Sequence, residues 1–217
     1  LRLATEKSLT RCGAEKFDLL LLHNPDVIGY TNESVWEGMS ALKAADLTDR
    51  VGIAPGPANG FTLDMLSCME KFADQIDWAM VILNPLEPWP GGLVLPAAEE
   101  FSIKVITRVV DHGGLFHGDV RPGHAFAEGD HRVYRPAGWV EVGNEKMDRM
   151  RAVAEEHGLS LLQLACLWNL AHPAVESVIP TLIQEAGDDA KTIEAKLDDL
   201  SALPALTLTD EQRDFIT

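Results

Sequence analysis

The chain is poor in positive charge and in long apolar runs. Its 217 residues contain 18 Lys and Arg against 34 Asp and Glu, for a formal net charge of -16. Few cations are available to neutralise nucleic-acid phosphates or anionic lipids, so the composition excludes both classes of partner. The longest apolar run, Leu19–Leu22, falls far below the roughly 20 residues of a spanning helix. The sequence therefore predicts no membrane span.

Cysteine is also scarce. Cys12, Cys68 and Cys166 are too few and too far apart for a disulfide framework or a CxxC-type zinc site. Their number is compatible with a reducing compartment, so we expect a cytoplasmic protein whose three thiols are buried.

The beginning of the chain has no initiator methionine and no charged and apolar leader. The first residues already have a helical pattern, with Leu1, Ala4 and Leu9 on one side. We therefore expect the sequence to begin within a larger structure.

Short apolar runs alternate with helical patterns along the rest of the chain. The first run, 17–23, is continuous, as in strands buried on both faces. This alternation predicts βαβ units and a parallel sheet. The predicted strands are 17–23, 51–54, 78–84, 103–110 and 175–180. The predicted helices are 32–42, 62–72, 93–100, 144–157, 160–172, 191–202 and a last one that starts at the capping pair Thr209 and Gln212. Thr62 and Asn144 are the predicted N-caps of their helices. The predicted inward faces are Ser34, Val35, Trp36, Met39 and Leu42 in the first helix and Leu63, Leu66 and Met69 in the second.

Residues 111–143 have no periodicity and are rich in Gly, Pro, His and Arg. A long irregular segment in a compact domain usually covers a site. Three interpretations of its polar residues stay open: solvated loop residues, contacts to a substrate or cofactor, and metal ligands, although the spacing matches no compact metal motif. These residues are Asp111, His112, His117, Asp119, His124, Asp130 and His131.

The five tryptophans fall into two groups. Trp36, Trp78 and Trp168 lie on predicted core faces. Trp89 and Trp139 lie in predicted loops, where they either line a substrate pocket or anchor the loop.

Each predicted strand ends in a residue that could take part in binding or catalysis, which favours a barrel over an open wound sheet. In a (β/α)8 barrel the carboxyl ends of the strands form one active-site face. These end residues are His23, Ala54-Pro55, Asn84, Arg108 and Pro180-Thr181.

Several segments resemble the aldo-keto reductases, in the order expected for that family. The resemblance implies one domain over 1–217, a (β/α)8 TIM barrel matched from about its fourth strand onward. It also implies that the first three βα units, about 90 residues, are missing from this chain. The matching segments are Ser8-Leu9 with Phe17–Asp26, Leu42–Ile53, Asn84–Leu86, Val105–Leu115, Leu161–Ala165 and Val178–Pro180.

The same resemblance implies an NAD(P)H-dependent oxidoreductase that transfers hydride between the cofactor and a small carbonyl, alcohol or sugar-like compound. The family's catalytic Tyr, Asp and Lys lie on strands that would precede Leu1, and Tyr30 and Tyr134 do not match that tyrosine's context. His23 matches the histidine that orients the substrate oxygen. The positions implied to bind the cofactor are Arg108, Gly113, Gly114, Leu115, Pro180, Thr181 and Glu194.

The choice between NADP and NAD stays open. Thr181–Gln184 and an acidic insert, Glu185–Asp189, replace the family's basic grip on the 2'-phosphate, and Lys196 replaces an asparagine. Two other functions also stay open: a nucleotide-binding barrel with a regulatory role and no turnover, and a metal-dependent lyase or hydrolase on the same scaffold. The sequence does not determine the oligomeric state.

Overall fold

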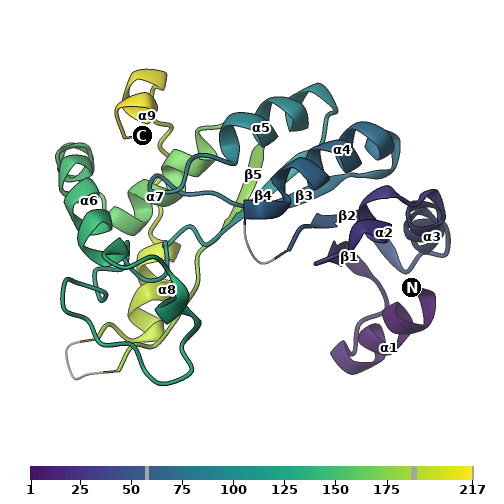
Figure 1. Cartoon of the computed structure of the whole chain (residues 1–217), viewed down its shortest axis with the longest axis horizontal. Coiled ribbons are helices and arrows are strands. Elements are labelled where there is room, and N and C mark those ends of the chain that lie inside the picture. Colours follow the sequence, from purple (N-terminus) through teal and green to yellow (C-terminus); the bar gives the residue numbers. More distant parts are fainter. Residues whose placement is uncertain (57–58, 187–189, 217) are drawn as a thin grey trace. The chain divides into compact units, whose positions relative to one another are not determined.

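The computed structural model describes residues 1–56, 59–186 and 190–216, which form two compact units (Figure 1). Unit 1 comprises Leu1–Ile82, Trp89–Ile106 and Pro173–Glu176. Unit 2 comprises Leu83–Pro88, Thr107–His172 and Ser177–Thr217.

Unit 1 is built on a sheet of five strands in the order β1-β2-β3-β4-β5. The pairs β1/β2 and β2/β3 are parallel, with Phe17 opposite Thr48 and His23 opposite Ala54. The last two strands continue along the chain into unit 2. The predicted α/β class with a parallel sheet is confirmed, whereas the absence of three further units stays a prediction. The strands are β1 (Phe17–His23), β2 (Thr48–Ala54), β3 (Trp78–Ile82), β4 (Lys104–Arg108) and β5 (Val175–Ile179).

Helices connect the strands of unit 1 and cover them. Trp36 is fully buried, donates its indole N–H to the Gly29 carbonyl at 3.0 Å, and stacks on Phe72 with ring centroids 5.7 Å apart. The elements are α1 (Arg2–Cys12), α2 (Val27–Thr31), α3 (Glu33–Ala44), the short 3-10 helix η1 (Asn59–Phe61), α4 (Thr62–Phe72), the 3-10 helix η2 (Ala73–Gln75) and α5 (Gly91–Glu100).

Unit 2 is mainly helical. The pair α6 and α7 contributes Met147, Met150, Leu162 and Leu164 to its core. The predicted capping pair at the last helix is confirmed, because the Gln212 N–H donates to Thr209 Oγ1 and the Thr209 N–H to Gln212 Oε1. The elements are η3 (His131–Tyr134), α6 (Trp139–Glu156), α7 (Leu161–Leu170), α8 (Ile193–Ser201) and α9 (Asp210–Ile216).

Two predicted N-caps are wrong. Thr62 is the first residue inside α4, and its hydroxyl donates to the Asn59 carbonyl. Asn144 lies inside α6, where its side-chain amide donates to the carbonyls of Val140 and Val120. The helix starts earlier because Gly138, with φ of 80°, ends the preceding loop. The β-branched and glycine residues of its first turn concealed this start from sequence reasoning.

Some predicted helix faces are also wrong. In α3, Trp36, Met39 and Leu42 are buried, but Ser34 is exposed and its N–H is capped by Asn32. In α4 the buried face contains Met65, Cys68, Met69 and Phe72, so Leu63 points outward at 67% exposure. In α1 only Leu9 of the three predicted apolar residues is buried. The helix α2 was missed, although Asp26 caps it by accepting from the N–H groups of Ile28 and Gly29.

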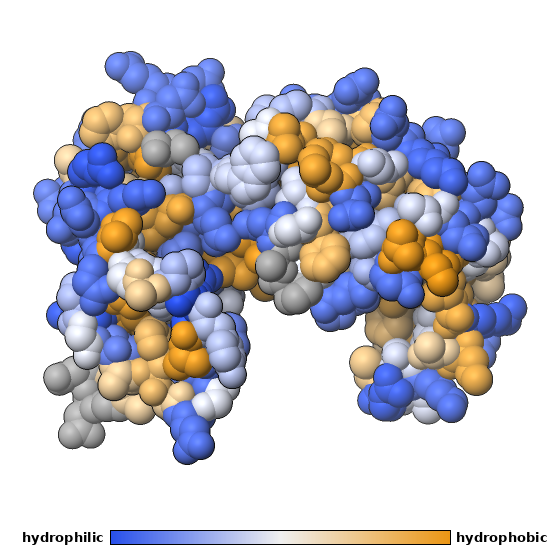
Figure 2. Space-filling view, in the orientation of Figure 1, coloured by the Kyte–Doolittle hydropathy of each residue, from blue (hydrophilic) through white to orange (hydrophobic). Residues whose placement is uncertain are grey.

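No helix in the described part of the chain is both long and apolar enough to cross a membrane. On the face shown in Figure 2, hydrophilic side chains surround scattered apolar ones, without a continuous apolar band.

We predict that the three cysteines differ in reactivity. Cys68 and Cys166 are buried as expected, and burial raises the pKa of each thiol to about 12, which suppresses the reactive thiolate. Cys12 is exposed, contrary to the expectation of three buried thiols. Iodoacetamide at neutral pH should alkylate Cys12 alone in the folded protein and all three thiols in denaturant, as read by peptide mass spectrometry. Fast labelling of Cys68 under native conditions would contradict the burial.

A second prediction concerns the close approach of β2 and β3. A Cβ on Gly52 would lie 2.1 Å from the backbone oxygen of Trp78, its partner in the parallel ladder. Gly52→Ala should therefore lower the free energy of unfolding by about 2 kcal/mol or more, measured by urea titration. Gly92→Ala is the matched control, because no atom lies within 4 Å of its Cβ position in α5 and alanine suits a helix better. Equal stabilities for the two variants would refute the strand contact.

Candidate functional site

The turn that follows β4 is the centre of the candidate site. Gly113 and Gly114 have φ of 68° and 96°, and His112 has φ of 47°. This left-handed backbone suits glycine, and it aims successive peptide groups to one side. Asn84 stabilises the start of the turn, because its side-chain amide donates to the Val109 carbonyl at 3.0 Å.

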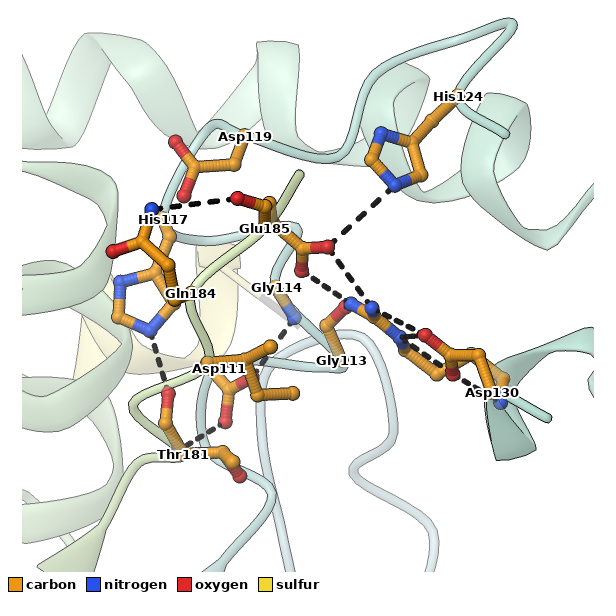
Figure 3. Close-up of polar contacts among 12 residues, drawn as sticks. Asp111, Gly113, Gly114, His117, Asp119, His124, Asp130, Thr181, Gln184 and Glu185 are labelled. Carbon is orange, nitrogen blue, oxygen red and sulfur yellow. Dashed lines mark hydrogen bonds and ion pairs between the residues drawn. The ribbon is translucent and has the colours of Figure 1, made fainter. Parts of the chain in front are cut away.

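Asp111 connects this turn to the segment after β5 (Figure 3). Its carboxylate is fully buried and accepts the Gly114 N–H at 2.8 Å through Oδ2 and the Thr181 N–H at 2.8 Å through Oδ1. The structure therefore brings together Gly113, Gly114 and Thr181, three of the residues predicted to bind a cofactor.

His117 reinforces the same connection. Its Nε2 lies 2.8 Å from the Thr181 carbonyl oxygen, which can only accept, so Nε2 carries the proton and donates. Burial lowers the pKa of His117, which favours the neutral ring. Leu115 is fully buried, and a Cβ on Gly143 of α6 would lie 2.4 Å from its Cδ1. Leu115 thus fastens the turn to α6.

A buried ion-pair cluster lies against the glycines. Arg132 is 4% exposed and pairs with Asp130 at 2.6 Å and with Glu185 at 2.5 Å. Burial alone would lower the pKa of Arg132, but its hydrogen bonds to Glu185 and Asp130 outweigh that effect and raise it. The hydrogen bond from Arg132 lowers the pKa of Asp130 to about 2. Sequence reasoning did not single out Arg132 or assign Glu185 a role at the glycines.

Two arginines and two aromatic rings form a chain of stacked contacts in residues 126–139. The Arg132 guanidinium lies 4.7 Å from the Phe126 ring centroid, Phe126 stacks on Trp139 at 5.8 Å, and Arg135 lies 4.7 Å from a Trp139 ring. Trp139 is the first residue of α6, not a loop residue as predicted. The segment is therefore packed by its own side chains.

His112 lies beside this stack with its edge toward Trp139. Arg135 Nη1 lies 3.3 Å from its Nε2, and because arginine only donates, the proton is on Nδ1, which lies 3.5 Å from the Glu87 carboxylate. Burial lowers the pKa of His112 to about 3, so the ring is neutral at ordinary pH. Burial also lowers the pKa of Arg108 at the end of β4, against the opposing effect of Glu87.

The segment after β5 supplies the remaining predicted positions. Pro180 is partly exposed, and Glu194 is exposed in the first turn of α8. Lys196 is buried instead, donating to the Ile183 carbonyl at 2.5 Å and pairing with Asp119 at 2.6 Å. The part of the acidic insert at 187–189 lies outside the described residues, as does Pro57.

His23 lies in unit 1, at the exposed end of β1 opposite Ala54. The cofactor positions Arg108, Gly113, Gly114, Thr181 and Glu194 all lie in unit 2.

The histidines and aspartates of 111–131 do not converge on one point. Within the described ranges no three His, Cys, Asp or Glu side chains gather so that they could hold a metal ion. Asp111, His112 and His117 are buried, so the interpretation as solvated loop residues is wrong for these three. Trp89 is 61% exposed.

Comparison with known proteins identifies the class to which this turn and sheet belong. A model of the aldo/keto reductase family matches residues 1–201, and the chain therefore belongs to that family. No curated protein matches the sequence.

Solved structures with the same fold are distant in sequence. A glycerol dehydrogenase from Gluconobacter oxydans is 21% identical with a TM-score of 0.78, the match covering 99% of this chain and 62% of that one. An aldo-keto reductase from Bacillus halodurans in its holo form is 20% identical with a TM-score of 0.64, covering 98% and 64%. An aldo/keto reductase from Klebsiella pneumoniae, solved with NADP and acetate, is 17% identical with a TM-score of 0.65, covering 99% and 62%. The chain thus spans less than two thirds of each of these relatives.

The Asp130 pKa generates a prediction for stability against pH. The folded-state pKa, about 2, lies below the ordinary value of 3.8, so ionised Asp130 stabilises the fold above pH 3.8. This contribution is lost as the pH falls from 3.8 to about 2. Asp130→Asn should therefore be less stable than the unmodified protein at pH 6, and the difference should shrink between pH 4 and pH 2. Chemical denaturation at each pH measures it, and a difference that is constant with pH would contradict the ion pair.

Proposed function

We propose that the protein is an NAD(P)H-dependent oxidoreductase that interconverts a small carbonyl compound and its alcohol by hydride transfer. The observation that carries the proposal is the Gly113-Gly114 turn, tied by Asp111 to Thr181 and flanked by the Arg132 cation. Family membership and the NADP complex of the Klebsiella relative support it.

The residues of the turn fit an anionic dinucleotide. The glycines permit the left-handed backbone of the turn, and Arg132 supplies a buried positive charge beside them. An anion already lies there, because a Cβ on Gly114 would be 3.2 Å from Glu185 Oε1. We assign Gly113, Gly114 and Thr181 to the diphosphate, Arg108 and Pro180 to the nicotinamide side, and Glu194 to the adenine side. Leu115 has a supporting role beneath the turn.

A bound reduced nicotinamide would supply the hydride to the carbonyl carbon, and the carbonyl oxygen would take its proton from water. We assign His23 to that oxygen, because an imidazole N–H at the carboxyl end of a barrel strand can donate a hydrogen bond to it. Neither tyrosine of the chain suits the proton donor. Tyr30 is 3% exposed with its hydroxyl accepting from the Gly56 N–H, and Tyr134 is 87% exposed in η3.

The structure offers no specific support for NADP over NAD. Lys196, which lies near the predicted adenine end, is engaged by Asp119 and Ile183. We therefore propose either nucleotide as cofactor.

The proposal predicts that nucleotide binding and carbonyl turnover can be separated by a substitution at His23. NADH or NADPH should bind the whole protein in a fluorescence titration and should be consumed with a panel of small aldehydes and ketones. His23→Gln should lower kcat by about a hundredfold, while the dissociation constant of the nucleotide stays within about twofold, because the assigned role is on the oxygen alone. His131→Gln is the matched control at a residue whose side chain is 85% exposed. Binding without turnover of any carbonyl would favour the regulatory barrel, and no binding of either nucleotide would refute the proposal.

A further inference from the structure

Arg132 has no hydrogen-bond donor left for a ligand. Nε donates to Asp130, Nη1 to Gly113 O at 3.0 Å and Glu185 Oε1 at 2.5 Å, and Nη2 to Glu185 Oε2 at 3.0 Å and Asp130 Oδ2 at 2.6 Å. A guanidinium has one N–H on Nε and two on each terminal nitrogen, so these partners use all of them. A phosphate oxygen can therefore bond to Arg132 only if one partner gives way.

Glu185 is the partner that can give way. Asp130 lies two residues from Arg132, also accepts its backbone N–H at 2.8 Å, and thereby caps η3. Gly113 contributes a backbone carbonyl of the turn itself. Glu185 comes from the segment after β5, 53 residues away in sequence. Its contact with His124 Nε2, at 3.6 Å, is longer than a hydrogen bond, so the side chain can leave by rotation about its own bonds.

The Glu185 carboxylate also lies where an anionic ligand of this turn would lie. A Cβ on Gly114 would be 3.0 Å from Val120 Cγ2, 3.2 Å from Glu185 Oε1 and 3.3 Å from Arg132 Nη1, so the carboxylate and the guanidinium lie with Val120 on the side of the glycine that has no side chain. Figure 3 shows Glu185 beside Gly114. Asp130 and Glu185 bring two negative charges to one positive charge. A diphosphate that bound beside both carboxylates would be repelled by them. A diphosphate that replaced the Glu185 carboxylate would instead accept the two hydrogen bonds that Arg132 now donates to Glu185.

We propose that Glu185 is an internal substitute for the nucleotide diphosphate, and that binding exchanges its carboxylate for phosphate oxygens on Arg132. This inference rests on the proposed function and adds a regulation of the same site. Every binding event must break the Arg132–Glu185 pair, so Glu185 lowers the apparent affinity for ligands that carry a diphosphate.

The test compares ADP, which carries the diphosphate, with adenosine, which does not. Glu185→Gln keeps the length of the side chain and one acceptor but removes the charge, and it leaves Arg132 paired with Asp130. By calorimetry, ADP and NADH should bind this variant about tenfold more tightly than the unmodified protein, while adenosine should be unaffected. Glu185→Asp keeps the charge but shortens the reach to Arg132, and it should give a smaller gain of the same sign.

Two further variants control for general loosening and for the role of Arg132. Asp119→Asn disturbs the buried pair with Lys196 in the same unit, without touching Arg132, and should not tighten ADP binding. In the double variant Arg132→Gln with Glu185→Gln, the gain should disappear, because the group that receives the phosphate is gone. Thermal melts of all variants verify that each is folded.

The outcomes separate this inference from the proposed function. If the unmodified protein binds NADH but Glu185→Gln binds ADP equally or more weakly, the exchange is refuted and the proposed function stands. If neither the unmodified protein nor Glu185→Gln binds NADH or ADP, the proposed function itself fails. A gain that survives removal of Arg132, or that appears in Asp119→Asn, also refutes the exchange.

Discussion

The candidate site depends on the buried carboxylate of Asp111. Two segments leave the sheet at the ends of β4 and β5, and each would otherwise be free to follow its own course. Asp111 gives one oxygen to the Gly114 N–H and the other to the Thr181 N–H, both at 2.8 Å. Since a buried backbone N–H without an acceptor is costly, this side chain determines where both segments lie. The glycine turn, His117 and the Arg132 cluster are all arranged around that point.

Internal ion pairs have an unusual importance in a chain with 34 acidic and 18 basic residues. Arg132 and Lys196 are 4% and 1% exposed, and each joins elements far apart in sequence. Buried pairs recover little more than the desolvation that they cost, so their main effect is to specify one arrangement of loop and helix.

The sheet could be predicted from the sequence because short segments rich in apolar and β-branched residues alternate with helical patterns, as in 17–23 and 175–179. The order of the family's segments and the glycine pair at 113–114 were readable for the same reason, since they depend on local pattern. The start of α6 could not be predicted, because it is determined by Gly138. The inward face of α4 could not be predicted either, because a shift of one residue changes which side chains are buried. The Arg132–Glu185 pair was also hidden. It joins residues 53 apart, and nothing local in either segment indicates the other.

The stack of Arg132, Phe126, Trp139 and Arg135 has an optical consequence. The Trp139 indole stacks on a phenyl ring, contacts a guanidinium and meets an imidazole in a T-shaped contact, so its surroundings differ from those of Trp36 and Trp168 in the cores. The segment around Arg132 therefore contains a native chromophore that is linked to the ion pair by one intervening ring.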